Sequence, residues 1–264
     1  MSIETSRKAL VHPTAIVDPE AELGPDVTVG PYSIIEANVS VGEGTKIGAR
    51  VTIEGHTTIG KENQIFTGAV VGSLTQDKKY KGGVTYLRVG DRNKIREYVT
   101  LNPGTEEGSE TVVGDDNLLM AYAHVAHNCI IGNNTIIANA GTLAGHVVVE
   151  DRAVIGGLSG VHQFVRIGYL AIMGGNSKAV QDVPPYVMVD GHPAKAYGLN
   201  VVGLERAGVP KEERMLLKRA FKIIYRYSLS TKNAIQVLKN EMQQSPAISK
   251  LIKFLENSER GICK

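Results

Sequence analysis

The chain has 264 residues with 5% aromatic side chains, no Trp and 29 Gly, a composition that favours a repetitive β-structure with tight corners over a helical bundle. Its two cysteines, Cys129 and Cys263, give no disulfide framework, which indicates a reducing compartment. The N-terminus shows no apolar signal region and no run of about eighteen apolar residues occurs, so we expect a cytoplasmic protein without membrane insertion.

The formal net charge is only +2, but the charge is unevenly distributed along the chain. Residues 191–264 contain fourteen Lys and Arg against six Glu and no Asp, a net charge of +8, and the rest of the chain carries −6. A basic end on an acidic body predicts an acidic partner that docks at the C-terminal end.

An aliphatic residue recurs at every sixth position from Val11 to Val71 without a slip. Such a hexad repeat is typical of a parallel β-helix, in which each hexad forms one side of a triangular coil and roughly eighteen residues complete a turn. Gly often fills the second position of the hexad, where we expect a corner that needs permissive backbone torsions. These second-position glycines are Gly24, Gly30, Gly42, Gly48, Gly60 and Gly72.

The repeat breaks at residues 73–88, a polar segment. We interpret it as a loop that projects from the triangular prism of coils, and we name it the excursion loop. The register resumes at Val89, and a shorter break at 107–112 precedes a central run of hexads from Val113 to Pro184. Long excursions from a regular scaffold usually carry function.

The central run places several histidines at related positions. Residues about eighteen apart should stack at the strand spacing of ~4.8 Å. His127, then Gly145 with His146, then His162 with Gln163 should therefore form one column along one corner of the prism. His127 is third in its hexad, so its imidazole should point away from the core and belong to a site.

The hexads end at residues 182–186, DVPPY, because consecutive prolines cannot supply the donors of a strand ladder. We therefore predict a β-helix domain at 1–190, which includes the excursion loop, and a small α-helical domain at 191–264.

Three helices are predicted in the C-terminal domain. The first follows Pro210, with apolar residues at helical spacing up to residue 227. Ser230 or Thr231 can cap a second helix that runs to about residue 244. Ser245 followed by Pro246 is typical of a helix start, and this third helix should run to about residue 258. A basic stripe follows every fourth residue of the first helix: Arg214, Lys218, Lys222 and Arg226.

Several segments stand in an order and at a spacing that resemble one family. AHVAHNC, LAGHV and VHQF carry the histidine column, QDKKY lies in the excursion loop, and QDVPPYV and NVVGLERAG follow the column. Together with HPTAIV, VGDRNKIRE and DNLLM they span essentially the whole chain, and they resemble the UDP-N-acetylglucosamine acyltransferase family of lipid A biosynthesis. Hexads alone would indicate function only weakly, since many proteins use them.

The resemblance implies a left-handed parallel β-helix and a homotrimer with active sites in the clefts between prisms. It implies transfer of an (R)-3-hydroxyacyl group from acyl carrier protein to the glucosamine 3-hydroxyl of UDP-N-acetylglucosamine, the first step of lipid A biosynthesis. No cofactor, metal or nucleic acid is implied.

The resemblance also assigns roles to the column. His127 matches the catalytic histidine, and neutral imidazole suits a general base that activates a sugar hydroxyl. The Gly145 N–H matches the expected oxyanion donor. Asn128 stands where many members carry Asp, so we predict a somewhat weaker base or help from another group. Three histidines and a glutamine are expected to line the cleft and bind substrate: His124, His146, His162 and Gln163.

Other matching positions concern the rest of the substrates. Gln76, Asp77 and Lys79 resemble residues that contact the sugar nucleotide, and Asn200 and Arg206 match nucleotide contacts. Gly175 matches a position whose size limits acyl length, and Met173 could narrow that groove. The basic stripe of Arg214, Lys218, Lys222 and Arg226 is a candidate surface for steering the acidic carrier protein.

Three alternatives stay open at this point. The sister N-acyltransferase of the same pathway normally has an additional N-terminal domain, for which hexads starting at Val11 leave no room. A hydratase of the γ-carbonic-anhydrase type could use His124, His127 and His146 as zinc ligands, and stoichiometric zinc would favour it. The third is a β-solenoid without activity. The residues also leave open the acyl length and whether the acceptor carries a 3-hydroxyl or a 3-amino group.

Overall fold

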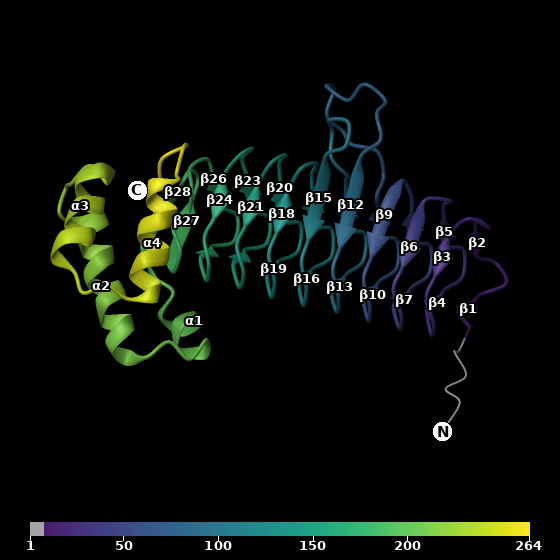
Figure 1. The fold of residues 1–264 in the computed structure, drawn as a ribbon, viewed down its shortest axis with the longest axis horizontal. Helices are drawn as coiled ribbons and strands as arrows, with labels where there is room; N and C mark the ends of the chain where they lie inside the picture. Colours follow the sequence, from purple (N-terminus) through teal and green to yellow (C-terminus); the bar gives the residue numbers. More distant parts are fainter. Residues whose placement is uncertain (1–7) are drawn as a thin grey trace.

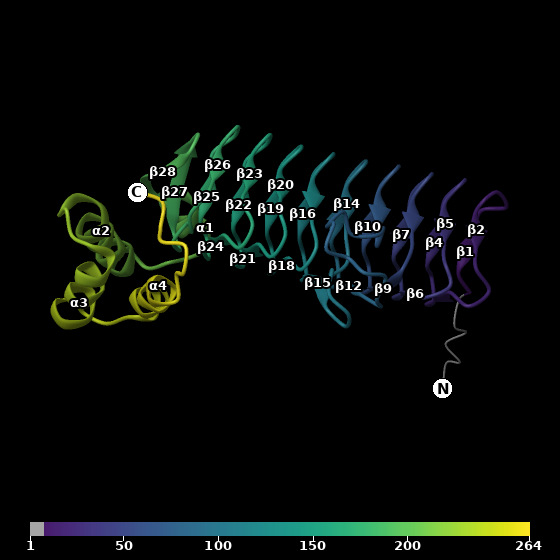
Figure 2. The ribbon, with the colours of Figure 1, turned by 90° about the horizontal axis from the view of Figure 1, so that it is seen from above.

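A computed structural model describes residues 8–264, in which short strands wind into a three-sided prism with four helices at its C-terminal end (Figure 1). Successive coils pair in parallel, as where Val125 faces Leu143, eighteen residues further along the chain. This arrangement is the predicted parallel β-helix. Figure 2 shows the coils stacked along one axis, with α2, α3 and α4 grouped beyond the last of them.

Each face of the prism is one sheet. Sheet A has eleven strands: β1 (Leu10–Val11), β4 (Thr28–Val29), β7 (Lys46–Ile47), β10 (Gln64–Ile65), β13 (Lys94–Ile95), β16 (Leu118–Leu119), β19 (Ile136–Ile137), β22 (Val154–Ile155), β25 (Ile172–Met173), β27 (Val187–Gly191) and β28 (Ala194–Leu199). Sheet B has nine strands: β2 (Ile16–Val17), β5 (Ile34–Ile35), β8 (Thr52–Ile53), β11 (Val70–Val71), β14 (Thr100–Leu101), β17 (His124–Val125), β20 (Thr142–Leu143), β23 (Gly160–Val161) and β26 (Lys178–Ala179). Sheet C has eight strands: β3 (Glu22–Leu23), β6 (Val39–Val41), β9 (His56–Ile59), β12 (Tyr86–Val89), β15 (Glu110–Val113), β18 (Ile130–Ile131), β21 (Val148–Val149) and β24 (Arg166–Ile167).

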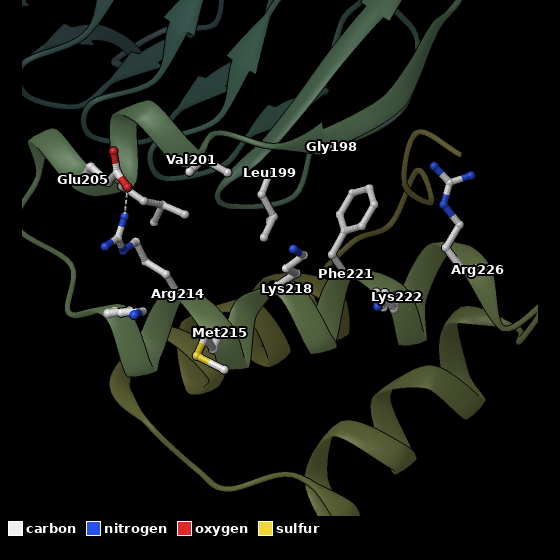
Figure 3. Close-up of a pocket in the computed structure, with 12 residues that line it drawn as sticks. Gly198, Leu199, Val201, Glu205, Arg214, Met215, Lys218, Phe221, Lys222 and Arg226 are labelled. Atoms are coloured by element: carbon white, nitrogen blue, oxygen red, sulfur yellow. Dashed lines mark hydrogen bonds and ion pairs between the residues drawn. The ribbon is translucent and has the colours of Figure 1, made fainter.

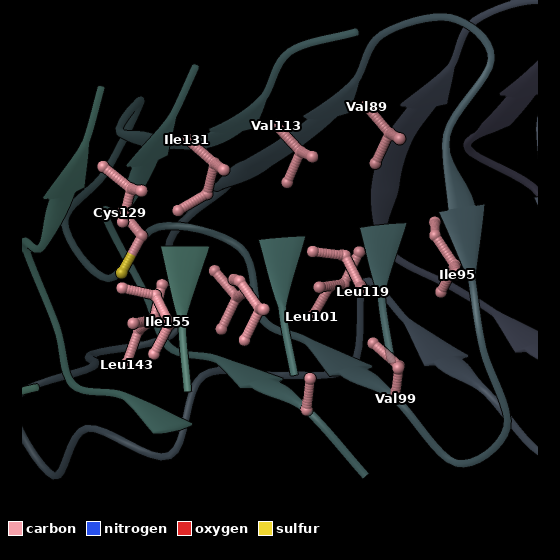
Figure 4. Close-up of a cluster of buried hydrophobic side chains, with 14 of the residues drawn as sticks. Val89, Ile95, Val99, Leu101, Val113, Leu119, Cys129, Ile131, Leu143 and Ile155 are labelled. Carbon is pink, nitrogen blue, oxygen red and sulfur yellow. The ribbon is translucent and has the colours of Figure 1, made fainter. Parts of the chain in front are cut away.

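The interior is filled by the first and fifth residues of the hexads. Ile131 and Leu143 are first residues and are at most 1% exposed, and Cys129, a fifth residue, is fully buried as a free thiol (Figure 4). Each fully buried aliphatic side chain stabilises the fold by about 1.5–3 kcal/mol relative to an exposed one. The six-residue period therefore specifies the core directly.

The corners correct one expectation from the sequence. The left-handed backbone torsion falls mainly at the fourth residue of the hexad, as at Asn128 (φ 58°) and His146 (φ 60°), and not at the second. Except for Gly72 (φ 90°), the second-position glycines serve close approach instead. A Cβ on Gly30 would lie 2.5 Å from the carbonyl oxygen of Gly48 in the next coil, so no larger residue fits there.

The excursion loop leaves the prism after β11 and stands out from it, as Figure 1 shows. It rejoins at Tyr86, three residues earlier than predicted, because Tyr86–Val89 extend β12. A hydrogen bond of 2.9 Å joins the hydroxyls of Thr75 and Thr105, and Asn102 Nδ2 donates to the Ser73 carbonyl over 2.8 Å. These bonds fasten the base of the loop to the corner below it.

The sheets continue past the two prolines, which the sequence did not predict. β27 pairs in parallel with β25, and β28 returns antiparallel to it, so strand structure extends to Leu199. A short helix, α1 (Val201–Arg206), follows and was also missed, because only one of its residues, Leu204, is buried and no apolar period marks it.

The three predicted helices are present as α2 (Lys211–Arg226), α3 (Thr231–Glu241) and α4 (Pro246–Glu256). Ser230 and Ser245 cap α3 and α4, each accepting a backbone N–H with its hydroxyl, so Ser230 and not Thr231 is the cap. Both helices end two to three residues earlier than predicted. None of the helices in residues 8–264 is long and apolar enough to cross a membrane.

The chain ends back on the prism. The Asp182 N–H donates to the Gly261 carbonyl and the Cys263 N–H donates to the Asp182 carbonyl, each over 2.9 Å. The Ser258 hydroxyl donates to Asp182 Oδ2 over 2.7 Å. This tail joins the helical domain to the last coil.

Candidate active site

The histidine corner is the edge of the prism between sheets B and C, and we define it by His127, Gly145 and Gln163. They are the third residues of successive hexads on this edge. The His146 N–H donates to the His127 carbonyl over 3.0 Å, and the Phe164 N–H donates to the Gly145 carbonyl over 3.2 Å. These bonds hold the coils in register and confirm the predicted column.

The His127 imidazole points out of the prism, yet only 6% of the residue is exposed. The excursion loop covers it, with Asp77 Oδ2 3.5 Å from Nε2. A cavity of about 380 Å³, which we call the His127 cavity, lies between the loop and the corner. Its lining residues are Gln76, Asp77, Lys78, Asn102, Ala126, His127, Ala144, Gly145 and Gln163.

Asn128 fixes the tautomer of the imidazole. Its Oδ1 lies 2.9 Å from His127 Nδ1 and also accepts the Thr105 N–H over 3.1 Å. Because the Thr105 N–H identifies that atom as the oxygen, Nδ1 must carry the proton of the neutral ring. Nε2 therefore presents its lone pair to the His127 cavity, as a general base requires.

Gly145 lies against the same imidazole. A Cβ at this position would be 2.4 Å from both Cε1 and Nε2 of His127, so only glycine leaves the ring where it is. Among residues 8–264 nothing accepts a hydrogen bond from the Gly145 N–H. An unused backbone donor beside a base is an arrangement that can stabilise a developing oxyanion.

The other predicted histidines lie outside the lining of the cavity. The His146 ring meets His127 edge-on at 5.2 Å and stacks on Phe164 at 4.6 Å. Burial lowers the pKa of His146, and the neighbouring His127 lowers it further. His124 Nδ1 lies 2.7 Å from the Thr100 hydroxyl, and burial lowers its pKa. His162 is exposed on the adjoining turn.

The hydratase alternative places its imidazoles between subunits, and within one chain the three histidines do not converge on a common point. Among residues 8–264 no group of three His, Cys, Asp or Glu side chains is arranged to hold a metal ion. His124 lies on β17 with its Nδ1 at the Thr100 hydroxyl, whereas His127 faces the excursion loop.

The excursion loop contributes a different lysine from the one predicted. Gln76 and Asp77 line the cavity as expected, but Lys78 borders it, and Lys79 lines a separate hollow at the loop tip with Lys81 and Glu106. The contact of Lys79 with a sugar nucleotide stays a prediction.

Asn102 is a lining residue that the sequence analysis missed. It is a second-position residue one coil before Ala126, since its N–H donates to the Val125 carbonyl over 3.0 Å. The insertion at 107–112 spaces these two residues by twenty-four instead of eighteen, which hid the relation. If residues 107–112 are left out of the count, Asn102 falls eighteen residues before Ala126 and its place in the column becomes clear.

Asn200 and Arg206 lie at α1, outside the His127 cavity. Asn200 is 3% exposed, its Oδ1 caps the helix at the Gly203 N–H over 2.8 Å, and its Nδ2 donates to the Leu170 carbonyl over 2.8 Å. Arg206 is exposed in the last turn. Asn200 thus has a structural role as a cap, and its contact with a nucleotide stays a prediction.

The prediction that Met173 narrows an acyl groove is wrong. Met173 is the first residue of its hexad, points into the core and is 1% exposed, so it cannot line a groove on the outside of the prism. Gly175 does lie exposed, at the corner between sheets A and B.

The basic stripe lines a second cavity, the helical groove, between α2 on one side and β28 with α1 on the other. Figure 3 shows Lys218, Lys222 and Arg226 projecting from α2 around a floor that includes Leu199 and Phe221. The groove has a volume of about 510 Å³. Arg214 forms an ion pair with Glu205 of α1, so it is the one member of the stripe with a carboxylate partner within residues 8–264.

Known proteins match both parts of the chain. A family model described as Udp N-acetylglucosamine O-acyltransferase, Domain 2, matches residues 182–263, and a model of six bacterial transferase hexapeptide repeats matches residues 110–145. The solved structure of LpxA from Acinetobacter baumannii superimposes with a TM-score of 0.93 at 44% identity, covering 97% of this chain and 100% of that one.

Curated relatives agree with the solved structure. An acyl-(acyl-carrier-protein)--UDP-N-acetylglucosamine O-acyltransferase from Herminiimonas arsenicoxydans is 49% identical over 261 residues, which are 97% of this chain and 100% of that one. One from Synechocystis is 52% identical over 176 residues, 67% of this chain and 64% of that one. The chain belongs to the acyl-(acyl-carrier-protein)--UDP-N-acetylglucosamine O-acyltransferase family.

Proposed function

We propose that this protein transfers an (R)-3-hydroxyacyl group from acyl carrier protein to the glucosamine 3-hydroxyl of UDP-N-acetylglucosamine, the first step of lipid A biosynthesis, in the cytoplasm. Family membership supports the reaction. One observation supports the mechanism. His127, whose Nε2 is unprotonated because Nδ1 bonds to Asn128, lines the same cavity as Gly145, whose backbone N–H has no acceptor within residues 8–264.

The sugar hydroxyl donates its hydrogen bond to Nε2 of His127, which removes the proton as the oxygen attacks the thioester carbonyl. The carbonyl oxygen becomes negatively charged and accepts the Gly145 N–H. When the tetrahedral intermediate collapses, the C–S bond breaks, and the imidazolium returns its proton to the leaving thiolate of the carrier protein. The products are the ester and the free thiol, and His127 is neutral again.

Asp77 supplies the charge that Asn128 lacks. Asn128 orients the ring but is neutral, so it stabilises the imidazolium less than a carboxylate would. Asp77 Oδ2 lies 3.5 Å from Nε2, and its side chain is only 19% exposed, so its field at the ring is weakly screened. The carboxylate of the excursion loop is therefore the other group that assists the base.

The remaining substrate contacts follow from the family match and the shape of the site. Gln76, Asp77 and Gln163 line the cavity where the sugar would enter. His124, His146 and His162 flank it, and Lys79, Asn200 and Arg206 serve the diphosphate and nucleoside. The exposed corner at Gly175 accommodates the acyl chain.

A homotrimer would complete the site. The outward side chains of sheet A are polar from β4 to β13 and apolar in the later coils: Leu118, Ile136, Val154, Ile172 and Met188. A flat, partly exposed aliphatic row of this kind supports packing against a second copy. Ile136→Glu should then yield monomers in light scattering, and an unchanged mass would contradict the trimer at this face.

The acyl carrier protein would dock at the helical groove. Lys218, Lys222 and Arg226 are exposed there and belong to residues 191–264, which carry a net charge of +8. Such charges mainly accelerate association with an acidic protein. Replacing all three by Gln should raise KM for the acyl carrier protein in a salt-dependent way and leave KM for the sugar nucleotide unchanged.

The proposal is tested by measuring acyl transfer to UDP-N-acetylglucosamine from acyl carrier protein loaded with acyl chains of several lengths. Wild type and His127→Gln are compared in the same assay. Transfer by wild type that falls by about a hundredfold or more in the variant would support both the reaction and the base. The 3-amino analogue of the acceptor is the second substrate. A folded wild type that acylates neither acceptor would overturn the proposed function.

A further inference from the structure

The side chain of Asn102 is buried next to the His127 cavity with one polar atom unused. Asn102 is 3% exposed, and its Nδ2 donates to the carbonyls of Ser73, at 2.8 Å, and Leu74, at 3.4 Å. Because two carbonyl oxygens face one end of the amide, that end must be the NH₂ group and the other end the oxygen.

Asn102 Oδ1 has no hydrogen-bond partner among residues 8–264, although the atom is buried. Buried polar atoms in native proteins are nearly always paired, so an unpaired one at a cavity wall points to a partner that binds there. Asn117 Nδ2 and Thr111 Oγ1 are also unpaired, but neither residue lines the His127 cavity.

The register places this oxygen close to the base. Asn102, Ala126 and Ala144 are second residues of successive hexads on this edge, and all three line the cavity. Asn102 is therefore one strand spacing, ~4.8 Å, from Ala126, the residue before His127. The two residues that follow Asn102 in this column are alanines, which leave the cavity wall beside His127 lined by small side chains.

We propose that Asn102 Oδ1 accepts a hydrogen bond from the acceptor sugar, from the donor on a carbon next to the reacting one, and that Asn102 is thereby a specificity-determining contact. This inference rests on the proposed function. An amide oxygen accepts and cannot donate, so it selects an N–H or O–H group and not a phosphate or carbonyl. On N-acetylglucosamine the 2-acetamido N–H and the 4-hydroxyl flank the 3-hydroxyl, and either has this chemistry.

Asp77 makes the assignment specific. The substituents on carbons 2 and 4 project to opposite sides of the 3-hydroxyl, so one faces the prism wall and the other faces the excursion loop. Asp77 lines the cavity from the loop side, and Asn102 lines it from the prism wall. The two carry out complementary recognition around a single reacting hydroxyl.

The test is binding of three sugar nucleotides by calorimetry: UDP-N-acetylglucosamine, its 4-deoxy-4-fluoro analogue and its N-methylacetamido analogue. Each analogue lacks one of the two donors. In wild type, losing the donor to Asn102 should weaken binding by about three- to tenfold, the range of one net hydrogen bond. In Asn102→Leu this preference should vanish for one analogue and persist for the other, and the analogue concerned identifies the donor.

A matched control separates this contact from the anchoring of the loop. Thr75→Val removes the hydroxyl bond to Thr105 and loosens the same loop without removing an oxygen from the cavity wall. It should weaken all three ligands in parallel and keep both preferences. If Asn102→Leu also keeps both preferences, or if wild type binds none of the three ligands, Asn102 is not a sugar contact and the inference is overturned.

Turnover measured in parallel keeps the two proposals apart. Acyl transfer by wild type with unchanged preferences in Asn102→Leu would refute the contact alone. If Asn102→Leu loses the binding preference for UDP-N-acetylglucosamine over one analogue, but wild type shows no acyl transfer, only the proposed reaction is refuted.

Discussion

Two edges of the same prism use identical backbone geometry for opposite purposes. The carboxylate corner, between sheets C and A, has Asp91, Asp115, Asn133 and Asp151 at the third position of its hexads. Each of their side chains accepts the backbone N–H of the third residue in the preceding coil, over 2.7 to 2.8 Å. The outward N–H groups of Lys61, Asp91, Asp115 and Asn133 are therefore all used within the chain.

The histidine corner has His127, Gly145 and Gln163 at the same position, and none of their side chains accepts the backbone N–H of the third residue in the preceding coil. Glycine at 145 leaves its own N–H open and admits the imidazole beside it. The comparison shows that a candidate site lies on this scaffold where no side chain in residues 8–264 accepts the backbone N–H groups of the corner.

The largest expected effect comes from adding one methyl group at each corner. Gly145→Ala should lower kcat/KM by about a hundredfold or more, because the new Cβ would lie 2.4 Å from the His127 ring and would push it out of position. The stability should change little, since only a side chain must move. Steady-state kinetics with thermal melting measures both effects.

Gly132→Ala is the matched change at the carboxylate corner. Its Cβ would meet Asp151 Oδ1 at 2.3 Å and the Asp151 backbone nitrogen at 2.8 Å, so this variant should lose about 1–3 kcal/mol of stability and retain activity. Equal losses of activity in the two variants would mean that the corners do not differ in function.

Moving the charge around His127 should have a smaller effect. Asp77→Asn removes the carboxylate beside Nε2 and should lower kcat/KM by about tenfold, corresponding to ~1.4 kcal/mol of imidazolium stabilisation. The measurement is kcat/KM of the variant beside wild type in steady-state kinetics.

Asn128→Asp in the Asp77→Asn background should restore part of that loss. It places a carboxylate on the Nδ1 side, 2.9 Å from the ring in the present geometry. Equal kcat/KM in the single and double variants would show that a carboxylate at position 128 does not replace the charge of Asp77.

At the carboxylate corner a side-chain deletion should affect only stability. Asp115→Ala removes the acceptor of the Asp91 N–H, a bond of 2.8 Å, and should lower the free energy of unfolding by about 1 kcal/mol. Denaturant titration would measure this loss. Asp115→Asn keeps an acceptor and serves as the control, and acyl transfer should be normal in both variants.

The smallest effect concerns a carboxylate that is buried instead of lying at a corner. Burial raises the pKa of Asp182 above its ordinary value. The folded protein thus holds this proton more tightly than the unfolded chain, so the contribution of Asp182 to stability is full at low pH and is lost as pH rises through the folded pKa. The melting temperature of Asp182→Asn should therefore change less between pH 4 and 7 than that of wild type. The difference should be a few degrees, which corresponds to about 1 kcal/mol of unfolding free energy. A parallel pH dependence in the two proteins would exclude this role for the Asp182 carboxyl.

The sequence predicted what the six-residue period controls. Because aliphatic residues at the first position must face inward, the period alone predicts where the strands lie and that His127, Gly145 and Gln163 share one edge. The same rule already indicated that Met173 is a core residue, and the wrong assignment to an acyl groove came from the family match alone.

The rest depended on features without a period. The hairpin of β27 and β28 forms after two prolines because its strands do not need donors from those residues. Asn102 was hidden by the insertion at 107–112, and the covering of His127 depends on how the excursion loop folds back, which short polar segments do not reveal.

The tail that returns to Asp182 also determines how the prism ends. A stack of parallel coils presents unpaired N–H and C=O groups at its last turn, and such an edge can recruit another chain. Here Val183 continues the ladder from Ile167, and Ile262 pairs with Asp182 on the outer side. The final residues thus cover the end of sheet C, the edge with which a further coil or a second chain would otherwise pair.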